Sequence, residues 1–142
     1  MDKFERMVLA VASARHEDWR KQYRAAKGNE PRMKKTKDPA FLARGIAEVD
    51  IASLLYEELP TDWQAENKAA AEVAVDSVLA AIDQDVALDD DFIEAVSAIQ
   101  HKKWLERNGA WAPDSQKVPY DELSEAEKEK DRFFVRQAIE AL

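Results

Sequence analysis

Residues 101–142 read HKKWLERNGAWAPDSQKVPYDELSEAEKEKDRFFVRQAIEAL, and this stretch decides the predicted fold. It starts inside a helical pattern, crosses a loop from Gly109 to Pro119, and enters a second helix after Ser124. Ser124 and Glu127 have the spacing of a capping box, which predicts where that helix begins. The stretch therefore predicts a helix–loop–helix unit. Its last helix is expected to bury Phe133, Phe134, Ala138, Ile139 and Leu142.

The same signature occurs a second time, earlier in the chain. An H-x-x-W motif lies at residues 16–19 and again at 101–104, and a Y-[DE]-E-L motif lies at 56–59 and again at 120–123. In the first copy 40 residues separate the His from the Tyr, against 19 in the second, so the first loop is 21 residues longer. Because each helix pair has one apolar face to cover, we predict two diverged copies packed as a pseudo-twofold pair.

The chain of 142 residues is thus predicted to be mainly α, with short extended segments in its loops. The first repeat covers residues 1–82 and includes a long basic loop at 28–55. An acidic connector at 83–89 leads to the second repeat at 90–142. We expect one compact protein in which the extra loop protrudes from one side.

Local signals define the remaining elements. Helical spacing predicts a helix from Phe4 to about Tyr23, and Asp38 followed by Pro39 predicts the start of a short helix that ends at Gly45. Residues 49–51 alternate as an extended segment does. These assignments place an irregular segment with one short helix between two long helices.

The two central helices are predicted from caps and apolar stripes. Thr61 and Gln64 have capping-box spacing before a stripe at Ala71, Ala74, Val75, Val78, Leu79 and Ile82. The acidic residues at 89–91 suit the start of a helix with Phe92, Val96 and Ile99 on its inner face, and Gly109 ends it.

Composition narrows the class of function. The net charge is −8, with 29 acidic residues against 21 Lys and Arg, which disfavours binding to nucleic acid. The absence of cysteine excludes disulfides, thiolate metal sites and a cysteine nucleophile. Charges interrupt the N-terminal apolar run, so we expect neither a signal peptide nor a membrane span but a soluble, cytoplasmic protein.

The sequence offers no motif for catalysis or metal binding. It lacks a nucleophilic serine motif and a phosphate-cradling glycine loop, and the acidic residues at 83–91 lack the Gly and terminal Glu of a calcium loop. His16 and His101 occupy equivalent places beside a Trp, which is typical of a scaffold role. We therefore predict a non-enzymatic protein without a cofactor or metal.

Two polar positions stand at the head of the inward helical stripes. Aligning the two Tyr residues pairs Asn67 with Asp131 and Lys68 with Arg132. A polar group on an inner face must find a hydrogen-bond partner or cost about 1–3 kcal/mol. We predict a bond from Asn67 or Asp131 to the imidazole of the same half, with ligand contact as the alternative.

A basic run is the strongest functional signal in this acidic chain. It lies in the long first loop, and the pairing of cations with Trp19 and Trp63 suits a phosphate and a stacked ring. The alternative is a solvated loop. The predicted ligand-binding residues are Trp19, Arg20, Arg32, Lys34, Lys35, Lys37, Tyr56, Trp63, Asn67 and Lys68, with second-repeat equivalents His101, Trp104, Trp111, Tyr120, Asp131 and Arg132.

Residues 101–142 resemble the RyR domain, the module repeated in ryanodine receptors and also found alone in bacterial and phage proteins. The likeness rests on H-x-x-W, on Trp111 after a glycine, and on V-P-Y-D-E-L followed by E-K-x-x-D-R. Residues 12–82 look like a more diverged copy in which Asn-Lys replaces Asp-Arg. The shortened segment at 112–118 lacks the glycines and the His-Pro usual in the family.

This resemblance implies a two-repeat helical fold and a regulatory or ligand-sensing role, with nucleotide-like ligands. Our leading hypothesis is a non-enzymatic module that binds a small anionic, nucleotide-derived ligand to sense or sequester it, at one pocket on the first-repeat side. The alternative is a protein-interaction or oligomerisation module without a pocket, and an enzyme using His16 or His101 is the third hypothesis. The sequence does not decide between a monomer and a homo-oligomer.

Overall fold

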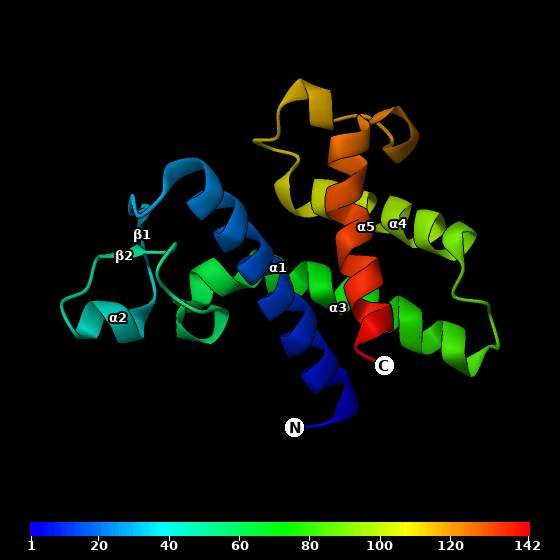
Figure 1. Ribbon diagram of the computed structural model, residues 1–142, viewed down its shortest axis with the longest axis horizontal. Helices are drawn as coiled ribbons and strands as arrows, with labels where there is room; N and C mark the ends of the chain where they lie inside the picture. The colour runs from blue at the N-terminus through cyan, green and yellow to red at the C-terminus, as the bar shows by residue number, and fades with distance from the viewer. The chain divides into compact units, whose positions relative to one another are not determined.

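The computed structural model describes all residues from 1 to 142 and is mainly α-helical, as predicted. Five α-helices and three short 3-10 helices are joined by loops, and the only strands are two of three residues each. No helix combines the length and the apolar character that crossing a membrane requires. In chain order the elements are α1 (Lys3–Lys27), β1 (Met33–Lys35), α2 (Pro39–Ala43), β2 (Glu48–Asp50), η1 (Tyr56–Glu58), α3 (Thr61–Asp83), α4 (Asp90–Asn108), η2 (Asp114–Gln116), η3 (Tyr120–Glu122) and α5 (Glu125–Glu140), as Figure 1 shows for the helices and strands.

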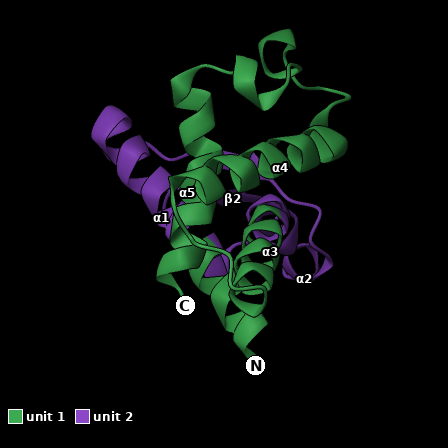
Figure 2. Ribbon diagram, turned by 90° about the vertical axis from the view of Figure 1, so that its right-hand side faces the viewer, with its two compact units in different colours: residues 1–11, 70–142 green, residues 12–69 purple.

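The chain forms two compact units (Figure 2). Unit 1 contains residues 1–11 and 70–142, and unit 2 contains residues 12–69. The chain therefore leaves unit 1 within α1 and returns to it within α3, so these units divide the chain differently from the predicted repeats. Each unit is described by itself below.

Unit 2 contains a small antiparallel hairpin that the sequence showed only in part. β1 pairs with β2 so that Met33 lies opposite Asp50 and Lys35 opposite Glu48. The extended segment predicted near Val49 is confirmed, and Val49 is buried. β1 was not predicted because Met-Lys-Lys has no alternation of apolar and polar residues. The consequence is that part of the basic run is a strand rather than a free loop.

Asp38 joins the starts of two helices in unit 2. Its carboxylate caps α2 by accepting a hydrogen bond from the Ala40 amide at 2.9 Å, as predicted. The same carboxylate accepts from the Thr61 amide at 2.8 Å and from the Thr61 hydroxyl at 3.0 Å, and these bonds lower the pKa of Asp38. The predicted capping box between Thr61 and Gln64 was wrong, because the Thr61 hydroxyl donates to the charged acceptor and Gln64 donates to the Tyr56 carbonyl.

Unit 1 has a core of small and branched residues from α3, α4 and α5. The buried face of α3 is Ala70, Ala71, Ala74, Val75, Val78 and Ala81. α5 packs across α4 (Figure 1) and contributes Phe134, Val135 and Ala138. Asp89 caps α4 through the Phe92 amide at 3.0 Å, and Ser124 caps α5 through the Glu127 amide at 3.2 Å, so both predicted N-caps are confirmed. The predicted capping box at Ser124 is only half formed, because the Glu127 carboxylate accepts from Lys130.

Three residues predicted to be buried in this core are exposed. Ile82 is 48% exposed, Ile99 43% and Leu142 46%. On α4 the buried positions include Ser97 and Gln100, and the Gln100 amide donates to the Ala70 carbonyl at 2.8 Å. The prediction for Ile99 was wrong because two polar residues occupy the inner face and turn the apolar side chain outward.

Candidate functional site

Each unit contains a histidine that holds a loop carbonyl. The Nε2 of His16 lies 2.8 Å from the Leu54 carbonyl in unit 2, and the Nε2 of His101 lies 2.7 Å from the Val118 carbonyl in unit 1. A carbonyl oxygen only accepts, so each ring donates from Nε2. Each carbonyl comes two residues before a Tyr that opens a 3-10 helix. We call each of these bonds a histidine clasp.

The clasps overturn one prediction about polar partners. Neither Asn67 nor Asp131 hydrogen-bonds to an imidazole, and the ring donor of each histidine goes to a backbone carbonyl instead. A loop carbonyl has no signature of its own in the sequence, so this partner could not be read from residue types. The side chains of Asn67 and Asp131 therefore do not bind the histidine of their own half.

A Trp follows each clasp by one helical turn. The rings of His16 and Trp19 stack with centroids 5.8 Å apart, and those of His101 and Trp104 with centroids 6.2 Å apart. Beyond the Trp the units differ. Trp19 continues the stack onto Tyr23 at 5.1 Å, whereas Trp104 meets the edge of a second Trp at 5.8 Å.

Unit 2 contains a cavity of about 220 Å³ beside its clasp. Three elements supply the walls: α1, the segment that follows β2, and the start of α3. The lining residues are Arg15, His16, Trp19, Ile51, Leu59, Trp63, Glu66 and Asn67. Two indoles and two apolar side chains face a small set of polar groups, which is the usual composition of a small-molecule site.

The polar groups of the cavity differ in charge and in bonding capacity. Burial lowers the pKa of His16, and the charge of Arg20 lowers it further, so the imidazole is neutral at physiological pH. Arg15 and Glu66 bring one cation and one anion. The amide of Asn67 forms no hydrogen bond within the chain, so its donor and acceptor remain available to a ligand.

Three of the predicted ligand residues lie together in this cavity, namely Trp19, Trp63 and Asn67. Arg20 lies outside it and donates to the Ala52 carbonyl at 3.0 Å and to Glu17. The sequence analysis missed Arg15 and Glu66, which lack any distinguishing motif. Tyr56 is buried in η1 and Lys68 is exposed on α3, and neither lines the cavity.

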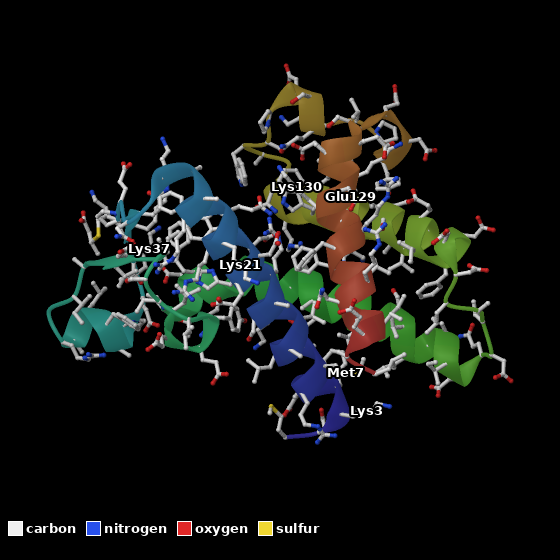
Figure 3. All side chains as sticks on the ribbon, in the orientation of Figure 1. Lys3, Met7, Lys21, Lys37, Glu129 and Lys130 are labelled. Atoms are coloured by element: carbon white, nitrogen blue, oxygen red, sulfur yellow. The ribbon has the colours of Figure 1, made fainter.

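The basic run lies beside the cavity rather than inside it. The Trp63 indole donates from Nε1 to the Lys35 carbonyl at 2.8 Å, and the Lys34 ammonium lies 5.8 Å from the centre of the Trp63 ring. At the ends of the run, the Arg32 amide donates to Asp50 and the Lys37 amide donates to Asp62, both at 2.8 Å. Lys37 itself is exposed on the segment between β1 and α2 (Figure 3). The basic strand β1 thus contacts Trp63, which lines the cavity, although β1 itself does not line it.

Unit 1 contains an ion cluster formed by side chains of α4, η3 and α5. The Arg132 guanidinium contacts Glu94, donates to Glu125 at 2.9 Å and donates to Glu129 at 3.0 Å. The Tyr120 hydroxyl donates to Glu94 at 2.9 Å. Arg132 is only 13% exposed, and Glu129 lies on α5 in Figure 3. Two predicted ligand residues, Tyr120 and Arg132, therefore bind side chains of their own unit.

This cluster changes the protonation equilibria of its members. The hydrogen bond from Arg132 lowers the pKa of Glu94, and the same cation lowers the pKa of Glu125. Burial, together with the bond to Glu94, raises the pKa of Tyr120 to about 12. The carboxylates of Glu94, Glu125 and Glu129 therefore stay ionised and paired near neutral pH. These ion pairs link α4 to α5 within unit 1.

Asp131 is the exception among the acids of unit 1. Burial raises the pKa of this carboxyl to about 7, and the nearby charge of Glu127 adds to the effect. Lys130 and Arg107 act in the opposite direction, but neither hydrogen-bonds to it. Trp111, another predicted contact, is 67% exposed on the loop before η2. Unit 1 thus contains the predicted aromatic and acidic residues, but their arrangement differs from that of the cavity in unit 2.

Comparison with known proteins gave no match: no protein-family model, curated protein or solved structure is similar to this chain.

Proposed function

We propose that the chain is a non-enzymatic, RyR-like binding module that holds a small anionic, nucleotide-derived ligand in unit 2. The flat ring of the ligand occupies the cavity between Trp19 and Trp63, and its anionic group lies outside, against the basic strand. The observation that carries this proposal is the position of Lys34 on the Trp63 ring, because one indole then links a ring site to a cation.

The volume of the cavity supports a ligand whose ring lies inside and whose anionic group lies outside. Sites for drug-sized molecules are roughly 300–1,000 Å³, so a cavity of about 220 Å³ accommodates a ring system but not a whole nucleotide. The phosphate of such a ligand therefore remains at the rim, where Lys34 is half-buried and Lys35 is exposed.

The clasps favour binding over catalysis. His16 and His101 are the only histidines of the chain, and each uses Nε2 to hold a loop carbonyl. A general base must reach a substrate proton, and a nucleophile must sit next to its base. No serine, threonine, cysteine or lysine side chain lines the cavity beside His16, so no side-chain nucleophile lies next to this ring. A sensing or sequestering protein needs only the site and no reacting group.

A thermal-shift screen with mono-, di- and cyclic nucleotides tests the proposal. A ligand present at 100 times its Kd stabilises the folded state by about 2.7 kcal/mol, which raises Tm by several degrees. Lys34→Gln should weaken binding severalfold, and Lys21→Gln serves as the matched control because Lys21 is exposed elsewhere on α1 (Figure 3). The proposal fails if no nucleotide at millimolar concentration stabilises the protein, or if the two variants weaken binding equally.

One observation favours a second function. Trp111 exposes 67% of its surface, and aromatic residues are enriched where proteins meet. An interaction module would use this ring to bind a second copy of the chain. Light scattering across a concentration series, with Trp111→Ser as the comparison, separates this function from ligand binding, because a ligand-binding monomer keeps the same mass at every concentration.

A further inference from the structure

The clasp in unit 2 fixes the hydrogen positions of His16. Its Nε2 must carry the proton, because it lies 2.8 Å from the Leu54 carbonyl, which only accepts. A neutral imidazole has one N–H, so Nδ1 then has a free lone pair. No donor of the chain bonds to Nδ1, and His16 lines the cavity. The ring is therefore held as an acceptor with a fixed orientation.

The other polar groups of the cavity include donors as well as acceptors. Glu66 contributes a carboxylate, and the unbonded amide of Asn67 contributes one carbonyl oxygen and one NH₂ group. The only cation that lines the cavity is Arg15. A ring without N–H or O–H groups would leave Nδ1 of His16 desolvated and unpaired, which costs binding energy.

We infer that the cavity selects an uncharged flat ring that donates hydrogen bonds from its edge, and that Nδ1 of His16 is the acceptor that determines this specificity. The inference rests on the proposed ligand-binding function and narrows the class of its ligand. A ring edge with a donor next to an acceptor, as in a lactam or an amidine, also satisfies the amide of Asn67. Rings that offer no donor to Nδ1 should bind about fivefold more weakly.

The charged groups around His16 do not alter its role near neutral pH. Arg20 and Arg15 both disfavour the imidazolium, whereas Glu17 and the bond to Leu54 favour it. Burial is the largest influence and keeps the pKa of His16 below its ordinary value. Nδ1 therefore stays an acceptor at the pH of the experiments below.

The first experiment observes the tautomer directly. A long-range proton–nitrogen correlation spectrum of the labelled protein shows which ring nitrogen carries the proton. Both histidines should be Nε2–H tautomers, and the spectrum of His101→Phe assigns the remaining signal to His16. A proton on Nδ1 of His16 overturns the inference without any ligand being involved.

The second experiment uses indole and benzofuran, which have the same shape but differ in one ring atom, an N–H donor against an oxygen. Nuclear magnetic resonance titration of the wild-type protein at pH 8 should give indole an affinity about fivefold higher, the effect of one net hydrogen bond. Equal affinities overturn the inference but leave the cavity as a ring site. Binding of neither probe at solubility-limited concentration counts against the ring site itself, and thus against the proposed function.

Variants then assign the preference to one atom. His16→Phe retains a ring against Trp19 but removes both nitrogens, so the fivefold preference for indole should disappear. His101→Phe is the matched control and should leave the preference unchanged. If His16→Phe does not fold, Asn67→Leu tests the remaining alternative: the inference requires that this variant still prefers indole, and loss of the preference would move the specificity to Asn67.

Discussion

The two histidine clasps share one local geometry but have different surroundings. In unit 2 the clasp lies next to a cavity with two indoles, whereas the salt bridges of unit 1 gather on Arg132, which corresponds to no residue that lines the cavity. The difference follows from a few side chains. Arg132 meets Glu94, whereas its counterpart Lys68 is exposed and forms no ion pair. The same histidine–carbonyl bond thus occurs in two units with different side chains around it.

We infer that the clasp has a structural role in both units and that the side chains around it account for the difference between them. We propose that the two segments are copies of one ancestral unit, since each clasp is followed by a Tyr-led 3-10 helix with the same main-chain bonds. After duplication, charge complementarity would stabilise one copy and leave the other free to bind. The predictions below test this difference, beginning with the largest expected effect.

The largest effect is expected from breaking either clasp. His16→Ala and His101→Ala should each lower the free energy of unfolding by about 3 kcal/mol, because each removes a buried ring and leaves a carbonyl without its donor. Urea denaturation measures the change. Lys102→Ala, next to the second clasp but exposed, is the control and should change stability by less than about 0.5 kcal/mol.

The two clasps should also be equal within error. If one alanine variant costs several kcal/mol and the other almost nothing, the clasps are not equivalent scaffolds and the comparison between the units fails.

The second effect concerns the ion cluster. Arg132→Ala should cost about 2 kcal/mol of stability, since it leaves Glu94 and its neighbours without their cation. Lys68→Ala, at the corresponding position of unit 2, should cost less than about 0.5 kcal/mol. Denaturant titration of both variants in low salt gives the answer, and equal costs would show that the cluster does not distinguish the units.

Much of this fold could be predicted from the sequence because its signals are local. Asp38, Asp89 and Ser124 cap the helices they were expected to cap, and apolar periodicity located the five helices. Features set by distant partners were not predicted. β1 exists because β2 pairs with it, and Thr61 donates to Asp38, 23 residues away, instead of forming a capping box.

The candidate site was predictable only where residue type alone is informative. Trp19 and Trp63 were named because an aromatic face near the basic run suits a stacked ring, and Asn67 because it is polar at the head of an inward stripe; all three line one cavity. The basic run was also named, but periodicity gave no means of placing it outside the cavity. Arg15 and Glu66 look like ordinary surface charges in the sequence, and only the packing of helices brings them into the site.

A smaller effect comes from the pair Asn67 and Asp131. Burial raises the pKa of Asp131 to about 7, so the folded state holds a proton that the unfolded chain has released. Stability should therefore fall as the pH rises from about 4 to about 7. Asp131→Asn removes this dependence and should be more stable than the wild type by about 1–2 kcal/mol at pH 8, with little difference near pH 4.

The reciprocal variant serves as the control for this pair. Asn67→Asp places a carboxyl in the cavity of unit 2 and should destabilise the protein more at pH 8 than near pH 5, because the ionised form lacks a partner there. Thermal unfolding at several pH values measures both variants. A wild-type stability that is flat between pH 4 and 7 would show that Asp131 is ionised and solvated in the folded protein.

The most direct test of the central claim follows the four tryptophan indole N–H signals during a nucleotide titration, with each signal assigned by a Trp→Phe variant. If unit 2 binds the ring of the ligand, Trp19 and Trp63 should shift and saturate together, because both line the cavity. Trp104 and Trp111, in unit 1, should shift little. Saturable shifts confined to Trp104 and Trp111, or no saturable shift at any of the four, would contradict the account.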